Sequence, residues 1–123
     1  MEPIYIEGTI RTPFVSLDPS GKFKISGRSI HENPSKFFDP IVEWVEAYVP
    51  DPPETTVFDI ELEYFNSGSS RYILDLLRLL LDNKKSNNLV INWYFEDGDD
   101  DLLERGQYYE SILNMKFNFI EYQ

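Results

Sequence analysis

The chain has 123 residues, a length typical of one domain with a real core, and 41% of them are hydrophobic. Eleven Lys and Arg residues against 22 Asp and Glu residues give a formal net charge of -11, which argues against binding to DNA, RNA or anionic membranes. The lack of cysteine excludes disulfides, thiol catalysis and thiolate metal sites. We expect a single globular domain, residues 1–123, in the cytoplasm, because the first residues lack the pattern of a signal peptide.

The first quarter of the chain is predicted to form strands. Residues 4–7 alternate apolar and polar side chains and are followed by a glycine, which predicts a short strand. A turn signal with proline and glycine at residues 18–21 separates two further alternating stretches, residues 14–17 and 22–27, and so predicts an antiparallel hairpin. Because only one side of this hairpin is apolar, only one side should face the core.

The next segment, residues 27–34, is rich in turn formers and lacks an apolar period, which predicts a loop. It contains the only histidine of the chain, His31, followed by Glu32. Adjacent side chains on an extended chain point in different directions, and no nucleophile accompanies this pair. We therefore interpret His31 as a surface histidine and not as half of an acid and base pair.

A first helix is predicted to begin where Asp39 precedes Pro40, because an acidic N-cap followed by proline is a frequent helix start. Its apolar stripe consists of Ile41, Val42, Trp44, Val45 and Tyr48. Three prolines soon after this stripe end the helix, since proline lacks an amide hydrogen and restricts the residue before it. Residues 49–54 are thus predicted to be an extended connector.

Residues 56–64 alternate between two kinds of side chain, which predicts a strand with one dry face and one charged face. The dry face consists of Phe58, Ile60, Leu62 and Tyr64. The charged face consists of Asp59, Glu61 and Glu63. We expect helices to cover the dry face and the charged face to stay open.

A hydroxyl-rich turn follows, and after it the apolar side chains of residues 73–81 recur at spacings of three and four, which predicts a largely buried helix. The start of a helix has free backbone amides and a partial positive charge, so it suits an N-cap and also a phosphate. In one interpretation a serine of the turn, Ser67, Ser69 or Ser70, caps the helix. Gly68 would then supply an unusual backbone angle. A cap needs only one hydroxyl, however, and the turn carries three.

Five carboxylates surround a glycine in residues 96–101 and invite a calcium-binding interpretation. An EF-hand loop alternates its ligands, has glycine at the sixth position and closes with a distant glutamate, and this run does none of these. We therefore interpret it as a solvated loop whose last acids favour the N-terminus of a third helix. The apolar positions of that helix are Leu102, Leu103, Tyr108, Tyr109 and Ile112.

The remaining segments complete an alternation of strands and helices. A polar loop is predicted at residues 82–88, a strand at residues 89–95 and a last strand at residues 116–122. This alternation implies parallel crossovers, whereas the N-terminal part is a hairpin. The expected fold is α/β, a mixed sheet with an N-terminal hairpin region and about three helices mainly on one face.

Several short motifs, in order along nearly the whole chain, resemble those of a known family. They are Ile6-Glu7-Gly8-Thr9 with Thr12-Pro13, Gly27-Arg28-Ser29 with Glu32-Asn33-Pro34, Trp44-Val45, and Tyr64-Phe65-Asn66-Ser67 with Ser69-Ser70-Arg71. Through them the chain resembles the SiaC family of bacterial regulatory phosphoproteins. The resemblance implies a fold similar to STAS domains, the anti-sigma-factor antagonists.

The resemblance also implies a non-enzymatic signalling protein that switches partners through reversible serine phosphorylation. By position in the motif the acceptor is Ser67, and Ser69 is the alternative because Gly68 stands where family members often have a hydroxyl. The implied modifying enzymes are a dedicated kinase and a PP2C-type phosphatase, and the implied candidate for the output partner is a diguanylate cyclase. The implied partner surface around the acceptor consists of Tyr64, Asn66, Gly68, Ser69, Ser70 and Arg71. The accompanying motif loop contributes Ser29, Glu32, Asn33 and Pro34.

Two other functions stay open at this point. One is a small acidic metal-dependent hydrolase that uses the acidic run or His31, but the sequence lacks a nucleophile elbow, a phosphate-binding glycine loop and paired histidines. The other is a constitutive binding module whose serines are only caps. In the preferred interpretation neither a metal nor a cofactor is expected.

Overall fold

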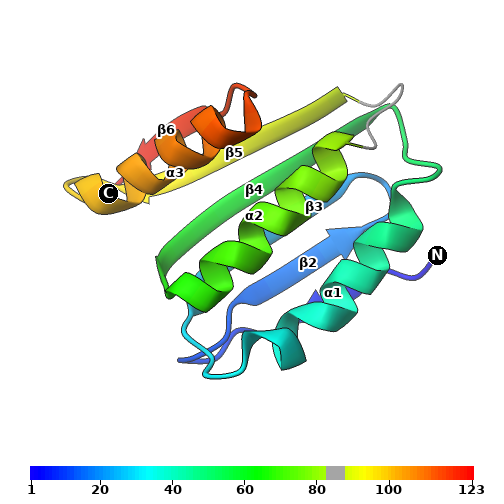
Figure 1. Ribbon diagram of the computed structural model, residues 1–123, viewed down its shortest axis with the longest axis horizontal. Helices are drawn as coiled ribbons and strands as arrows, with labels where there is room; N and C mark the ends of the chain where they lie inside the picture. The colour runs from blue at the N-terminus through cyan, green and yellow to red at the C-terminus, as the bar shows by residue number, and fades with distance from the viewer. Residues whose placement is uncertain (83–87) are drawn as a thin grey trace.

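The computed structural model describes residues 1–82 and 88–123, which form a six-stranded sheet and three helices (Figure 1). The polar loop predicted at residues 82–88 lies mostly outside these described residues. The elements in chain order are β1 (Ile4–Ile6), β2 (Phe14–Asp18), β3 (Lys22–Ser29), α1 (Pro34–Tyr48), β4 (Thr55–Phe65), α2 (Ser67–Asp82), β5 (Asn88–Glu96), α3 (Asp100–Leu113) and β6 (Asn118–Tyr122). None of the helices in the described part of the chain has the length and apolar character needed to span a membrane.

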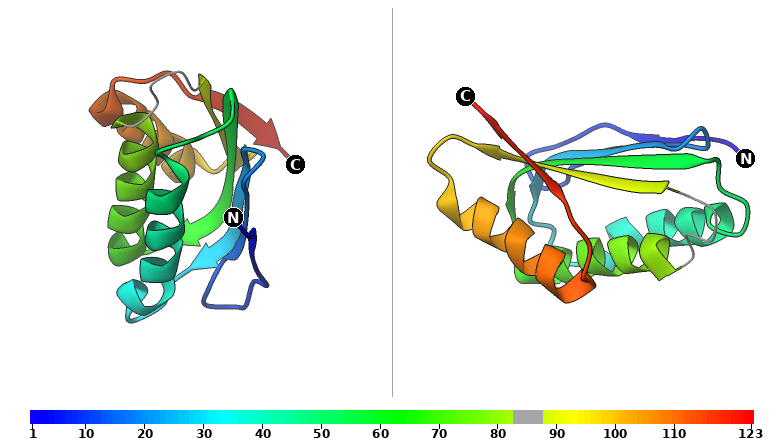
Figure 2. Two further views of the ribbon diagram at one scale, coloured as in Figure 1. Left: turned by 90° about the vertical axis from the view of Figure 1, so that its right-hand side faces the viewer. Right: turned by 90° about the horizontal axis from the view of Figure 1, so that it is seen from above.

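The strands lie in the sheet in the same order as in the chain. β1, β2 and β3 pair antiparallel, and β3, β4, β5 and β6 pair parallel. Each parallel pair is connected through one helix. Because right-handed crossovers that always advance in one direction place every helix on the same side, the three helices cover one face and leave the other open (Figure 2). The predicted mixed α/β sheet is therefore confirmed.

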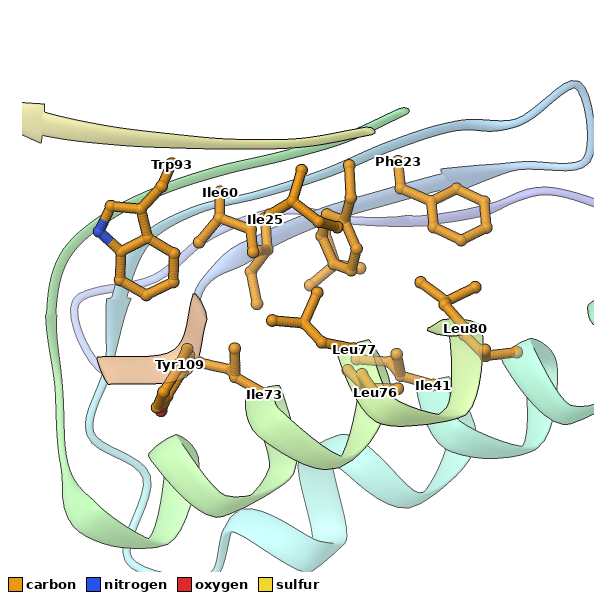
Figure 3. Close-up of a cluster of buried hydrophobic side chains, with 14 of the residues drawn as sticks. Phe23, Ile25, Ile41, Ile60, Ile73, Leu76, Leu77, Leu80, Trp93 and Tyr109 are labelled. Carbon is orange, nitrogen blue, oxygen red and sulfur yellow. The ribbon is translucent and has the colours of Figure 1, made fainter. Parts of the chain in front are cut away.

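The core lies between the covered face of the sheet and the helices (Figure 3). Phe58, Ile60 and Leu62 of β4 point into it, as their alternation predicts. The core residues labelled in Figure 3 are Phe23, Ile25, Ile60 and Trp93 from the sheet and Ile41, Ile73, Leu76, Leu77, Leu80 and Tyr109 from the helices. Burial of these large apolar side chains is the main force that fixes the helices against the sheet.

The pairing of β3 with β4 contains a bulge. Gly27 pairs with Leu62, and the next residue of β3 pairs with Tyr64, so Glu63 is an extra residue of β4. Because side chains alternate along a strand, one extra residue exchanges the two faces. The prediction that Tyr64 shares the dry face with Leu62 is therefore wrong: Tyr64 is 53% exposed, whereas Phe65 is fully buried.

Helix α1 begins earlier than predicted. It starts at Pro34, and the predicted start at Pro40 lies inside the helix. Proline in a helix interior costs about 3 kcal/mol. The first turns nevertheless stay helical because they bury Phe38, which stacks on Tyr72 of α2 at 5.2 Å between ring centroids. Burial of a phenylalanine contributes roughly 2 to 3 kcal/mol, which offsets most of the proline cost.

The acidic run has the role that its position before a helix predicts. Asp99 is the N-cap of α3, and its side chain accepts a hydrogen bond from the Leu102 amide at 3.1 Å. Asp100 and Asp101 occupy the first turn, where negative charge is favoured. No group of three or more His, Asp or Glu side chains in residues 1–82 and 88–123 is arranged to hold a metal ion.

The buried face of α3 differs in part from the predicted one. Tyr108 is 65% exposed and Ile112 is also exposed, although both were predicted to be apolar core positions. The helix packs instead through Gly106 against the indole of Trp93. In this orientation of the helix, Tyr109 is buried in the core and Tyr108 faces solvent.

Candidate functional site

The hydroxyl-rich turn between β4 and α2 lies at the carboxyl edge of the parallel strands, where the loop that follows β3 also lies (Figure 1). Asn66 connects the two. Its backbone amide donates to the Ser29 carbonyl at 3.0 Å, and its Nδ2 donates to the His31 carbonyl at 3.4 Å. The motif loop and the turn, which are far apart in the sequence, are thus held together.

Asn66 is also the N-cap of α2. Its Oδ1 accepts a hydrogen bond from the Ser69 amide at 2.9 Å, and its backbone carbonyl accepts one from the Ser70 amide at 2.9 Å. The hypothesis that a serine caps this helix is therefore wrong. Asparagine ranks with serine among the best N-cap residues, so the residue before the three serines takes the role and leaves their hydroxyls for other contacts.

Removing this cap should destabilise the protein. We expect Asn66→Ala to lower the free energy of unfolding by about 1 to 2 kcal/mol, because the helix loses its cap and the turn loses its side-chain tether to the motif loop. Urea unfolding followed by tryptophan fluorescence measures the change. Asn66→Asp keeps the capping oxygen and should lose less, so equal losses in the two variants would contradict the capping role.

The three serines of the turn have different surroundings. Ser69 has 0% exposure, and its hydroxyl accepts a hydrogen bond from the Ser29 hydroxyl at 2.8 Å. The Ser70 hydroxyl bonds that of Tyr109, which also donates to the Ser70 carbonyl at 2.9 Å. Ser67 is exposed and its hydroxyl makes no hydrogen bond to any residue that the structure describes. Only one of the three hydroxyls is therefore free at the surface.

Gly68 permits a close contact and does not supply an unusual backbone angle. The glycines with positive φ in the described chain are Gly21, Gly27 and Gly98. A Cβ atom on Gly68 would lie 2.9 Å from Cγ of Pro34, the first residue of α1. The prediction of an unusual angle is thus wrong, and the glycine lets the start of α2 pack against the start of α1.

The other members of the motif loop lie around this contact. β3 continues to Ser29, so the loop predicted at residues 27–34 is shorter than expected. Asn33 is the N-cap of α1, and its amide donates to Nδ1 of His31 at 2.9 Å. Glu32 points elsewhere and pairs with Arg11 at 3.6 Å, both side chains being exposed. A pair of this kind contributes little to stability.

Helix α3 supports the turn from the other side, which the sequence did not indicate. The Arg105 guanidinium donates to the Phe65 carbonyl at 2.7 Å and lies 4.2 Å from the centroid of the Phe65 ring. It thereby satisfies the last carbonyl of β4. Burial raises the pKa of the Tyr109 hydroxyl, which keeps it a protonated donor to Ser70. Forty residues separate Arg105 from its partner, so no local pattern could reveal it.

Ser67 lies at a position that favours a negatively charged group. It is the first residue of α2, where free amides and the helix dipole favour an anion. Arg71, one turn further on the same side of the helix, is exposed and pairs with Asp75 at 3.6 Å. The geometry suits a covalently added phosphate.

Comparisons with known proteins identify a family and solved structures that this chain resembles. The model of the SiaC family regulatory phosphoproteins matches residues 6–122. An uncharacterized protein of Pseudomonas aeruginosa strain UCBPP-PA14 is 25% identical over 119 residues, which are 95% of this chain and 94% of that protein. The structure of SiaC of Pseudomonas aeruginosa superposes with a TM-score of 0.84 at 25% identity, covering 99% of this chain and 100% of that one.

A further solved structure shows the same fold in a complex. It is the crystal structure of diguanylate cyclase SiaD in complex with its activator SiaC, from the same species. The matched chain is 23% identical, with a TM-score of 0.88, and the match covers 97% of this chain and 99% of that one. The α/β fold of the chain and its agreement with the solved structures are thereby established.

Proposed function

The chain belongs to the SiaC family of regulatory phosphoproteins, and from this membership we propose that it is a non-enzymatic signalling protein switched by phosphorylation of Ser67. One observation carries the choice of residue: Ser67 is the only hydroxyl of the turn that is exposed and unbonded within the described chain. Ser69, the alternative acceptor, has no exposed surface for a kinase to reach.

A phosphate on Ser67 would change the surface more than the fold. It adds a charge of about -1.5 to -2 and three strong hydrogen-bond acceptors. Its placement at an exposed helix N-terminus contributes about 0.3 to 1 kcal/mol, which is too little to refold a domain. Hydrogen bonds of Asn66 and Arg105 hold the turn from both sides. We therefore expect the backbone of the turn to keep its conformation when the phosphate is added.

The family and the site together support a proposal for the partners. SiaC of Pseudomonas aeruginosa is the activator of the diguanylate cyclase SiaD, and by analogy we propose a diguanylate cyclase as the output partner of this chain. A dedicated serine kinase and a PP2C-type phosphatase would set the phosphorylation state of Ser67. The unphosphorylated form would bind the cyclase, because its turn carries no charge that a covering partner must desolvate.

Intact mass spectrometry after incubation with ATP and a candidate kinase from the same organism tests this proposal. The wild type and Ser67→Thr, which keeps a hydroxyl at the position, should each gain the mass of one phosphate. Ser67→Ala should gain none. If Ser67→Ala gains a phosphate, the phosphorylated residue is not Ser67. If none of the proteins gains a phosphate, the proposal of a phosphorylation switch is wrong. Ser70→Ala, a neighbouring serine variant, should be phosphorylated like the wild type.

A further inference from the structure

The bulge in β4 turns an aromatic side chain out of the core at the edge of the open sheet face. Tyr64 is 53% exposed there, and Tyr108 of α3, which is 65% exposed, lines the same cavity. Bulges often re-aim a side chain near a functional surface. Exposed tyrosines that line one cavity are frequent at surfaces that bind a partner, because their rings are apolar and their hydroxyls are polar.

Two cavities meet at Tyr64. One, of about 520 Å³, lies between the end of β4 and the first turns of α3 and is lined by Tyr108, Arg105 and Glu104 among others. The second, of about 560 Å³, lies on the open sheet face and is lined by Tyr122, Glu61 and Glu96 among others. The residues common to both are Glu63, Tyr64 and Asp99. We call the two cavities together the Tyr64 groove.

The Tyr64 groove is acidic. Carboxylates line both cavities, whereas each contains a single arginine, Arg28 in one and Arg105 in the other. Arg105 is already occupied by the carbonyl and the ring of Phe65. Burial raises the pKa of Tyr122, and the charges of Glu61 and Glu96 raise it further. The carboxylates that line the two cavities therefore give the groove a negative potential that favours cations.

We propose that the Tyr64 groove docks an arginine-bearing or lysine-bearing segment of a protein partner. Tyrosine faces attract guanidinium and ammonium groups, and carboxylates beside them give such cations directed hydrogen bonds. A second copy of this chain is a poor occupant, because its net charge is also -11. The inference rests on the proposed function in one respect, since it describes the partner whose binding Ser67 controls.

The groove and the phosphorylation turn would then be two parts of one interface. Ser67 follows Tyr64 by three residues, across the connection from β4 to α2. A partner segment in the groove would bring the rest of the partner over the start of α2. The groove would attract the partner in both phosphorylation states of Ser67. The charge on the turn would decide whether the partner also makes close contact with the start of α2.

Titration with a short acetylated and amidated peptide of alternating arginine and alanine, followed by amide NMR shifts, tests the groove directly. The largest shifts should fall on residues that line it. Glu63→Lys and Tyr64→Ala should each weaken binding about tenfold. Glu46→Lys changes the net charge by the same amount at an exposed position of α1, far from the groove, and should change affinity less than about twofold.

Three other results of this titration would overturn the inference. An equal loss with Glu46→Lys would show attraction by net charge alone, and shifts elsewhere would place the cation site on another surface. Shifts that depend on protein concentration without peptide would assign the groove to a second copy. Ser67→Ala should bind the peptide like the wild type, so a failure of phosphorylation at Ser67 leaves this result intact and the two proposals fail separately.

Discussion

Replacing Ser67 by aspartate is expected to weaken binding of the output partner by about 3 kcal/mol, a factor of roughly 100 in Kd. Ser67→Ala should bind like the wild type. The difference arises because a covering partner must remove water from the new carboxylate, while the cations of the partner are already paired with the carboxylates of the Tyr64 groove. Isothermal titration calorimetry with the proposed partner, a diguanylate cyclase from the same organism, measures both affinities.

The comparison needs a control for charge alone. Ser20 lies in the turn between β2 and β3, at the other end of the sheet, and is exposed. Ser20→Asp therefore adds the same charge at a distant position and should bind the cyclase with wild-type affinity. Equal binding by Ser67→Asp and Ser67→Ala would remove the switch, whatever the kinase experiment shows.

The largest effect on stability is expected at Gly106. A Cβ atom there would lie 2.6 Å from Nε1 of Trp93, whose side chain is fully buried and donates to the Leu102 carbonyl at 3.0 Å. Alanine gains about 1 kcal/mol of helix propensity over glycine, but a displaced indole costs more than this. We expect Gly106→Ala to lower the free energy of unfolding by about 1 to 2 kcal/mol and Gly106→Val by about 3 kcal/mol.

Urea unfolding monitored by tryptophan fluorescence gives both values. Gln107→Ala, at the exposed neighbouring position of α3, should change stability by less than about 0.5 kcal/mol. A Gly106→Ala protein as stable as the wild type would show that the indole moves aside freely. Displacement of α3 would also carry Arg105 away from Phe65, so Gly106→Val should weaken partner binding as well.

Much of the fold could be predicted because its elements carry strong periodic patterns. The alternation of Phe58, Ile60 and Leu62 with acidic residues predicted a half-covered sheet, and strands alternating with helices predicted the parallel crossovers. The acidic run could be assigned as well, since acids before an apolar period are typical of a helix start. These patterns depend on residues that are close in sequence.

The errors occurred where distant contacts decide the local structure. The bulge at Glu63 depends on the register of β4 against β3, so alternation alone placed Tyr64 on the wrong face. Pro40 stays inside α1 because Phe38 packs on a residue of α2. Asn66 and the serines after it rank equally as caps, and only the tertiary contacts of the loop at His31 select the asparagine.

The anchoring of Asn66 has a consequence for any enzyme that modifies the adjacent hydroxyl. Ser67 is presented on a helical backbone whose neighbours come from positions 35 to 40 residues away in the chain. A linear peptide with the same sequence lacks those neighbours and is too short to form a stable helix in water. A kinase that modifies Ser67 would therefore recognise the assembled three-dimensional epitope, and we expect kinase assays on synthetic peptides to underestimate the reactivity of the intact protein.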